Sequence, residues 1–279
     1  MPESWGFTMA EHVAPEHGSG TVRYEVNDHV GTILIDRAER VNALSTAVME
    51  ELISAVERAD EDAEVRVLVI RGAPGKGFCV GRDLRETRQR DTQADGSRRD
   101  SLQMRGTRRN VFEAVLECGK PTVAAIFGFT LGGGAELALA CDVRIAADDL
   151  QFGFPEATLG LGANFASQML PRIIPMPAAY DLLYTARRVE ATEAKALGLV
   201  NQVVPSEQLL AAANSWAAKV AGNAPLTTRR YKAMISKGRD LPLAAALRLD
   251  VGPNPYLSED RMEGVAAWTE KRSPQWKAK

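Results

Sequence analysis

Two glutamates and a run of glycines are the residues of this chain that are best suited to chemistry. Glu136 stands in the segment GGGAELALA, where its neighbours are small or apolar, so it would be a lone carboxylate in a buried helix. Burying such a charge is costly unless it has a partner or a catalytic task. A carboxylate in the first turn of a helix is also stabilised by the helix dipole. On this segment alone, a structural and a catalytic role for Glu136 therefore both stay open.

A second acid follows at Glu156, directly after Pro155 in the segment QFGFPE. The proline fixes the backbone just before this glutamate. Two carboxylates can share acid and base work when their environments move their pKa values apart. The sequence therefore predicts a pair of acids that two different elements of the fold bring together.

Two glycine-rich loops could supply backbone N–H groups to the same site. Residues 132–134 (GGG) lie between a predicted buried strand, residues 121–126 (PTVAAI), and the helix that carries Glu136. The first N–H groups of a helix have no intrahelical partner, and glycine lets a ligand approach them closely. Residues 72–84 (GAPGKGFCVGRDL) follow a predicted strand at 65–70 and form either an ordinary connection or a second wall of the site. One N–H group from each loop could together hold an oxyanion.

Other kinds of site have little support in the sequence. The three histidines, His12, His17 and His29, all lie near the N-terminus, so we expect neither a histidine triad nor a multi-histidine metal site. The glycines match neither the dinucleotide-binding fingerprint nor the phosphate-binding loop. The three cysteines are scattered and show no metal-binding spacing, which suits a reducing cytoplasm.

Charge and hydropathy narrow the partners and the location. A net charge of −2 over 279 residues gives no indication of nucleic acid or of an anionic membrane surface. No apolar run reaches the roughly 18 residues of a membrane-spanning helix, and the N-terminus lacks the pattern of a secretory signal. We therefore expect a cytoplasmic protein.

The elements that must position these residues divide the chain into three parts. Residues 1–20 are polar and aperiodic and are predicted to be a flexible tail. Residues 21–205 are predicted to form an α/β core, which opens with a hairpin and with a helix capped by Ser45. Residues 206–279 are predicted to be a helical C-terminal region.

Three details of this division can be checked against the structure. The charged residues 85–109 are predicted to lead into a helix at 102–116, and Thr192 is predicted to cap a helix that ends at Gly198. Several large apolar residues of the C-terminal region are either its core or a subunit interface. They are Trp216, Leu226, Met234, Met262 and Trp268.

Five segments, in this order and spacing, resemble the enoyl-CoA hydratase/isomerase (crotonase) superfamily. They are VNAL at 41–44, GFCVGRDL at 77–84, GFTLGGGAELALACDVRIA at 128–146, FGFPEATLGL at 152–161 and EAKALGLVNQVV at 193–204. The resemblance runs from about residue 21 to the C-terminus. It implies a spiral core of repeated ββα units, a helical C-terminal trimerisation region, and a homotrimer or a dimer of trimers.

The resemblance also implies a reaction and a set of roles. Glu136 and Glu156 match the acid pair of the hydratases, and the backbone N–H groups of Arg82 and Gly133 match the oxyanion hole that holds the thioester oxygen. The implied reaction is syn addition of water to the α,β double bond of an enoyl-CoA, with no metal or redox cofactor, since coenzyme A is part of the substrate. The implied substrate and coenzyme A contacts are Arg40, Val41, Ala43, Val80, Gly81, Arg82, Asp83, Leu84, Gly132, Gly133, Pro155 and Asn164.

One segment departs from the pattern of the family. Where typical hydratases have a stretch like PGAGGTQRL, residues 160–170 read GLGANFASQML, with Asn164 and Phe165 in place of small residues. This segment lines the acyl pocket in the family, so the change is either neutral drift or a reshaped acyl site in which Asn164 adds a polar contact. Two alternative functions stay open beside the hydratase. One is a double-bond isomerase, and the other is a non-catalytic acyl-CoA-binding protein.

Overall fold

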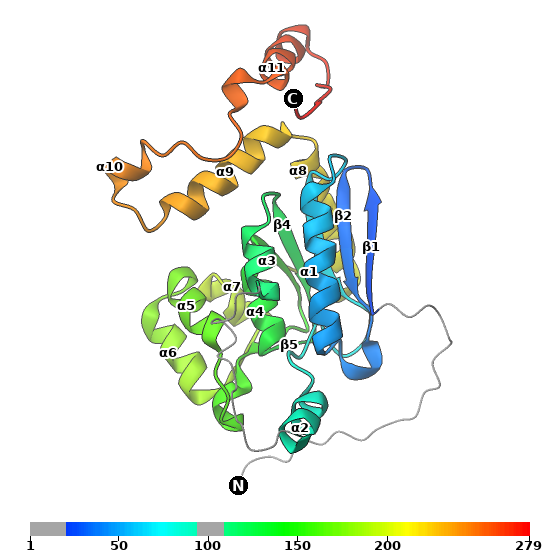
Figure 1. Ribbon diagram of the computed structural model, residues 1–279, viewed down its shortest axis with the longest axis vertical. Helices are drawn as coiled ribbons and strands as arrows, with labels where there is room; N and C mark the ends of the chain where they lie inside the picture. The colour runs from blue at the N-terminus through cyan, green and yellow to red at the C-terminus, as the bar shows by residue number, and fades with distance from the viewer. Residues whose placement is uncertain (1–20, 94–108) are drawn as a thin grey trace.

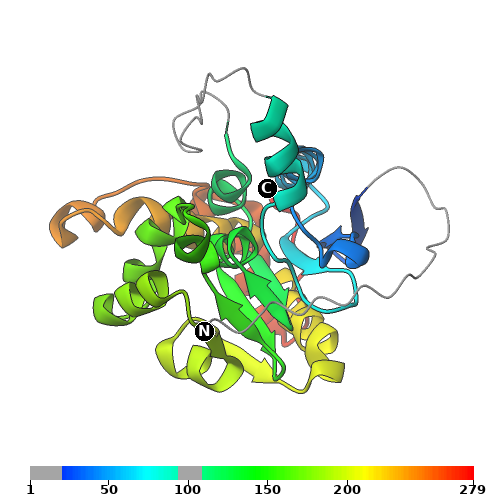
Figure 2. The same cartoon turned by 90° about the horizontal axis from the view of Figure 1, so that it is seen from below.

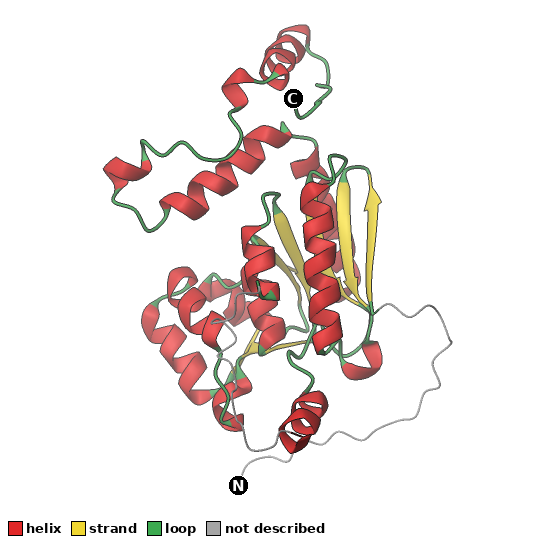
Figure 3. Cartoon of the chain, viewed as in Figure 1, coloured by secondary structure: helices red, strands yellow, loops and turns green. Residues whose placement is uncertain are grey.

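The computed structural model describes residues 21–93 and 109–279, which form a mixed α/β fold around two sheets (Figures 1 and 3). Within these residues, the larger sheet has the strand order β1-β2-β3-β4-β6-β9, and the smaller has the order β5-β7-β8. In the larger sheet β1 runs antiparallel to β2, and the remaining neighbours run parallel. The strands are β1 (Val22–Asn27), β2 (Val30–Ile35), β3 (Val67–Gly72), β4 (Thr122–Ile126), β5 (Phe129–Leu131), β6 (Val143–Ala147), β7 (Gln151–Gly153), β8 (Arg188–Glu190) and β9 (Gln202–Val204).

Helices cover both faces of the larger sheet. In Figure 1, α1 and α3 lie in front of the sheet and α8 lies behind it. The helices are α1 (Thr46–Glu61), α2 (Leu84–Gln93), α3 (Val111–Glu117), α4 (Gly133–Ala140), α5 (Asn164–Ile173), α6 (Met176–Thr185), α7 (Ala191–Leu197), α8 (Leu209–Ala221), α9 (Pro225–Gly238), α10 (Leu243–Ala246) and α11 (Glu259–Glu270).

The central strand β4 shows why the chain forms two apolar layers. Successive side chains of a strand point to opposite faces, and every residue of β4 is buried. Ala124 and Ile126 join the larger core, which α1, α3 and α4 cover, whereas Val123 and Ala125 join the smaller core under α8. An uninterrupted apolar run is what a strand covered on both faces requires. β4 therefore holds a fixed position, and the residues that follow it are placed at one end of the sheet.

The hairpin, the capped helix and most of the predicted later elements are confirmed. Ser45 accepts a hydrogen bond from the Val48 amide at the start of α1, and Gly198 ends α7 with φ 83°. Two details are wrong. The helix predicted at 102–116 begins at Val111 in the described part of the chain, because Asn110 and Glu113 cap it reciprocally. Thr192 lies inside α7 and is not its cap, since that helix already begins at Ala191.

Two predictions lie partly or wholly outside the described residues. The predicted tail at 1–20 lies outside them, as does the part of the predicted helix that precedes residue 109. The boundary near residue 205 stays a prediction, and α8, which follows it, packs on β3, β4 and β6. In Figure 1 the chain leaves the sheet only after α8, where α9, α10 and α11 extend from its upper end.

The C-terminal helices present apolar side chains to solvent. Met262 and Trp268 are 70% and 87% exposed, so a role as core of this chain is wrong for these two residues. Trp216, Leu226 and Met234 are half-buried. No helix in residues 21–93 and 109–279 is long and apolar enough to cross a membrane.

Candidate active site

The candidate site lies where β4 ends, at the lower end of the molecule in Figure 1. Figure 2 looks onto this end, where β5, α2, α5 and α6 gather around the start of α4. Gly132 precedes α4 with φ 53° and ψ −126°, a backbone conformation that only glycine adopts without strain. The Glu156 Oε1 atom lies 2.8 Å from the place that a Cβ atom on Gly132 would occupy. The glycine thus admits both the turn and the carboxylate that lies against it.

Glu136 is buried in the first turn of α4, with 5% of its surface exposed. Its Oε1 atom accepts a hydrogen bond of 2.9 Å from the Ala166 amide of α5. Burial raises the pKa of this carboxyl to about 7; the Ala166 hydrogen bond opposes the shift and the nearby Glu156 carboxylate adds to it. Glu136 can therefore gain and lose a proton near neutral pH, as a general base must.

Glu156 stands at the start of the 3₁₀ helix Pro155–Leu159, which Gly160 ends in a left-handed conformation. Burial raises the pKa of Glu156 as well. Its Oε2 atom is buried and has no hydrogen-bond partner in the described part of the chain. An unsatisfied buried oxygen is costly in a protein interior, so this atom is suited to a bound water or a substrate. The Glu156 charge acts on the Glu136 carboxyl, so the two acids lie near each other, and their roles stay predictions.

The second glycine-rich loop runs beside the start of α4. Cys79 accepts a hydrogen bond from the Leu131 amide, and its own amide donates to Phe129. A Cβ atom on Gly81, whose φ is 81°, would lie only 2.6 Å from the Gly133 nitrogen. The two backbones therefore touch where the sequence predicts an oxyanion hole, and Gly133 is more exposed than the buried glycines on either side of it.

Leu44 orients the amide of Arg82. The Leu44 amide donates to the Gly81 carbonyl at 2.7 Å, and the Leu44 carbonyl accepts from the Asp83 amide at 3.0 Å. Arg82 forms a parallel β-bridge with Leu44, in which the carbonyl before Arg82 and the amide after it point toward Leu44. The N–H group of Arg82 itself therefore points to the opposite side of the backbone, away from Leu44. The Gly133 amide is at the first position of α4, where N–H groups have no intrahelical acceptor.

Asn42 is the functional-site residue that sequence reasoning missed. It is fully buried with φ 55°, and its side-chain amide donates to the carbonyls of Ala73 and Gly77, both at 3.0 Å. Its Oδ1 atom accepts from the Arg37 amide at 3.1 Å. These bonds fasten the glycine-rich loop at its base. A polar residue in the left-handed region within an apolar motif, VNAL, is the signal that could have found it.

The predicted substrate contacts lie on five stretches of chain, 40–43, 80–84, 132–133, 155 and 164. Val80 donates to the carbonyl of Val41 at 3.2 Å, so the contacts at 40–43 and 80–84 form one surface. The Asp83 carboxylate is bound by Arg37 at 3.2 Å and by the Arg85 amide at 3.1 Å. Burial opposes ionisation of Asp83, but these bonds outweigh it and lower its pKa. Leu84, which ends the 80–84 stretch, is half exposed at the start of α2. Pro155 precedes Glu156, and Asn164 begins α5.

Comparison with known proteins assigns the chain to a family. A family model described as enoyl-CoA hydratase/isomerase matches residues 25–279. The chain belongs to the enoyl-CoA hydratase/isomerase family. The short-chain-enoyl-CoA hydratase of Clostridium acetobutylicum is 33% identical over 251 residues, which cover 89% of this chain and 94% of that protein. A mouse relative, the mitochondrial enoyl-CoA hydratase domain-containing protein 2, is 34% identical over 293 residues, which cover 100% of this chain and 97% of that protein.

Solved structures confirm the crotonase fold of this family member. The enoyl-CoA hydratase of Bacillus anthracis matches with a TM-score of 0.84 and 37% identity, covering 93% of this chain and all of that one. A structure from Streptomyces coelicolor, titled putative enoyl-CoA hydratase, matches with a TM-score of 0.84 and 33% identity, covering 97% of this chain and 98% of that one. The roles of the individual site residues stay predictions.

Proposed function

We propose that this protein is an enoyl-CoA hydratase, which adds water reversibly and with syn stereochemistry to the α,β double bond of an acyl-CoA thioester. The observation that carries the proposal is the pair of shielded carboxylates, Glu136 and Glu156, beside the turn at Gly132. Relatives named enoyl-CoA hydratase at 33–36% identity over most of the chain support it.

The two acids would act as one unit that carries a single proton. The charge of Glu156 raises the cost of ionising Glu136, so the pair favours one charge over two. The ionised Glu136 takes a proton from the attacking water, whose oxygen bonds to the β-carbon. The protonated Glu156 gives its proton to the α-carbon. The two acids exchange roles in the dehydration direction, as reversibility demands.

The backbone amides of Arg82 and Gly133 would stabilise the charge that this addition creates. As water adds, electron density passes from the double bond to the thioester oxygen, and neutral oriented donors hold it there. Removing one such donor from similar sites costs about 3–4 kcal/mol of transition-state stabilisation. Because this reaction adds the elements of water across a double bond and passes no electrons to an external acceptor, we propose that it requires no metal or redox cofactor.

Turnover in heavy-oxygen water tests this function. Crotonyl-CoA, incubated with the protein in water enriched in the heavy isotope, should give a hydroxyacyl-CoA that carries one labelled oxygen, read by mass spectrometry. An isomerised product without label would make the protein a double-bond isomerase. Tight thioester binding without any product would make it an acyl-CoA-binding protein that does no chemistry.

We also propose that the protein works in the cytoplasm as a homotrimer or a dimer of trimers. Exposed apolar side chains of the C-terminal helices support a subunit interface, and they include Leu243, Leu247, Leu257, Met262 and Trp268 at 70–87% exposure. Sedimentation equilibrium measures the mass directly, and a monomer at micromolar concentration would contradict this assembly. The three cysteines are buried free thiols, in keeping with a reducing compartment.

A further inference from the structure

Arg37 joins two stretches of the predicted substrate contacts, and the proposed chemistry does not use it. Its side chain is 17% exposed. The Nη1 atom donates to the Ala43 carbonyl at 2.8 Å, and the Nη2 atom donates to the Asp83 carboxylate at 3.2 Å. One planar guanidinium therefore ties the stretch 40–43 to the stretch 80–84.

Arg37 also holds a turn that a polypeptide backbone does not adopt readily. Val41 and Asn42 both have left-handed conformations, with φ 50° and 55°, and a β-branched residue such as valine is rarely found there. The Arg37 amide donates to the Asn42 Oδ1 atom at 3.1 Å, and the Arg37 carbonyl accepts from the Asn42 amide at 2.9 Å. A strained turn persists only where its surroundings fix it, and such strain gathers at functional sites.

The turn leads to Leu44, which sets the direction of the Arg82 amide. The Gly81 carbonyl and the Arg82 N–H group belong to one trans peptide group and point in opposite directions. The Leu44 amide donates to that carbonyl at 2.7 Å, and the Leu44 carbonyl accepts from the Asp83 amide at 3.0 Å. Both bonds go to a single residue, so the peptide group can still tilt about Leu44. The ion pair of Arg37 with the Asp83 side chain is a further bond, away from Leu44, and it opposes this tilt.

We propose that Arg37 is a positioning residue, which aims the Arg82 amide at the thioester oxygen by holding Asp83. This inference rests on the proposed hydratase function and assigns a task to a residue outside the reacting groups. Asp83 also fixes the start of α2, where its Oδ1 atom accepts from the Arg85 amide at 3.1 Å. Burial opposes ionisation of Asp83, but its bonds to the Arg85 amide and to Arg37 outweigh it and lower its pKa, so Asp83 is charged at neutral pH.

The vibration of a bound thioester carbonyl measures this positioning without turnover. Butyryl-CoA cannot be hydrated, and hydrogen bonds from the two proposed amides should lower the stretching frequency of its thioester carbonyl. Infrared difference spectra, with and without a heavy-carbon label at that atom, should show this shift in the unaltered protein. Arg37→Met should lose most of the shift. The frequency of the bound carbonyl does not depend on how much of the protein is folded.

Hydration of crotonyl-CoA gives the rate that depends on the same positioning. Arg37→Met should lower kcat by about 10- to 100-fold and change the dissociation constant of butyryl-CoA by less than about 3-fold, because a misaimed amide weakens the transition state more than the ground state. Arg37→Lys keeps a cation for Asp83 but cannot also reach the Ala43 carbonyl, so it should restore part of the kcat. Asp83→Asn keeps the cap of α2 and removes the ion pair, so it should resemble Arg37→Met.

Arg230 provides the matched control. Its side chain is also 17% exposed, and it binds one carboxylate, Asp250 at 2.9 Å, and one backbone carbonyl, Pro253 at 3.4 Å. It lies on α9, at the opposite end of the molecule from the proposed site (Figure 1). Arg230→Met should leave the carbonyl frequency and the kcat unchanged. If Arg37→Met does not fold, Asp83→Asn and Asp250→Asn give the same comparison.

The two measurements separate this inference from the proposed function. A carbonyl shift that Arg37→Met removes, in a protein that hydrates no enoyl-CoA, would overturn the hydratase and support the positioning role. A shift and a kcat that Arg37→Met and Asp83→Asn both leave unchanged would overturn the positioning role and leave the hydratase standing. Equal losses in Arg37→Met and Arg230→Met, or a carbonyl without any shift in the unaltered protein, would also overturn the positioning role.

Discussion

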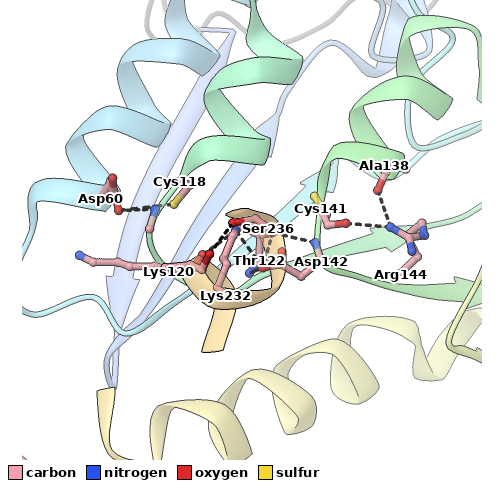
Figure 4. A network of polar contacts seen from close by, with 12 residues as sticks. Asp60, Cys118, Lys120, Thr122, Ala138, Cys141, Asp142, Arg144, Lys232 and Ser236 are labelled. Carbon is pink, nitrogen blue, oxygen red and sulfur yellow. Dashed lines mark hydrogen bonds and ion pairs between the residues drawn. The ribbon is translucent and has the colours of Figure 1, made fainter. Parts of the chain in front are cut away.

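The carboxylates at the two ends of the central strand β4 differ in how many hydrogen-bond and ion-pair partners they have. At its lower end, Glu136 has one backbone hydrogen bond and Glu156 has a buried oxygen without a partner in the described residues. At its upper end, the Asp142 carboxylate accepts from the Thr122 amide at 2.7 Å, from the Thr122 hydroxyl at 3.1 Å and from the Lys232 ammonium at 2.9 Å. Figure 4 shows this upper network, with Lys232 reaching from α9 to the sheet.

The difference separates a site that holds the fold from a site that we propose does chemistry. Asp142 meets a full cation and a cluster of donors, so its charge stabilises the folded state and joins α9 to the core. Glu136 and Glu156 have few donors and face each other, so their charges cost stability. A protein interior retains such under-satisfied groups chiefly where a ligand or a reaction uses them.

The largest expected effect is on turnover at the lower end. Glu136→Gln and Glu156→Gln should each lower the kcat of crotonyl-CoA hydration by about 10²–10⁴-fold, the usual contribution of a general acid or base. Glutamine keeps the shape of the side chain but cannot carry the proton. A stopped-flow or steady-state assay of the enoyl chromophore measures the loss.

The matched control for these variants is Glu190→Gln, an exposed glutamate before α7 that makes no capping bond. It should keep full activity. Full hydration rates in both Glu136→Gln and Glu156→Gln would contradict the proposed roles.

The same Glu136→Gln variant should become more stable relative to the unaltered protein as the pH rises. The folded-state pKa of Glu136 is about 7 against an ordinary value of 4.5, so its protonated form stabilises the fold below pH 4.5 and this contribution is lost as the pH rises through 7. Glutamine does not titrate, so the free energy of unfolding of the variant should rise relative to the unaltered protein by at most about 3 kcal/mol across that interval.

Urea unfolding at pH 5 and pH 8 measures this difference, with Glu25→Gln on the exposed edge of β1 as the control. If the difference in unfolding free energy between Glu136→Gln and the unaltered protein is the same at both pH values, the fold does not raise the pKa of Glu136.

The upper end should respond to substitution in the opposite way. Asp142→Asn removes the charge that pairs with Lys232 and should lower the free energy of unfolding by about 2 kcal/mol, a value reduced because Asp142 is 34% exposed. Its crotonyl-CoA kcat should stay close to that of the unaltered protein. Asp250→Asn breaks a comparable pair with Arg230, but Asp250 is 80% exposed, so its effect should stay within about 0.5 kcal/mol. Equal unfolding free energies for the two variants would contradict the structural role of Asp142.

The site at the lower end of β4 could be predicted from the sequence better than the network at its upper end, because most of its features lie close together in the sequence. A buried strand, a glycine turn and a lone acid in an apolar helix occupy neighbouring positions, and each has a direct physical meaning. Asn42 escaped notice because its acceptors, Ala73 and Gly77, lie 31 and 35 residues away. The contact of Phe112 with Phe165 joins α3 to α5, and the pairing of Lys232 with Asp142 joins α9 to the residue before β6, so both depend on tertiary packing. The start of α3 moved because a reciprocal cap of Asn110 and Glu113 overrode the apolar pattern.

The smallest expected effect concerns the pH dependence of the acid pair. The kcat/KM of crotonyl-CoA reports the ionisation of the free protein, and the proposed reaction needs one proton on the acid pair. It should therefore fall as the pH rises through about 7, where Glu136 loses its proton beside a charged Glu156. Burial is the main cause of that raised pKa, and the charge of Glu156 adds to it. Glu156→Gln removes this added repulsion, so Glu136 should ionise at lower pH, and the limb of the residual activity that follows Glu136 should move down by less than about one unit.

The control for this shift is Glu156→Asp, which keeps the negative charge and should keep the limb near its original position. A limb that moves to higher pH in Glu156→Gln would mean that Glu156 stabilises the charge of Glu136 through a water or a donor. In that case the carboxylates at the two ends of β4 would differ less in the number of their polar partners than the structure indicates. A limb that moves down in the glutamine variant and stays in the aspartate variant would establish that the lower end keeps its charges unsatisfied in solution.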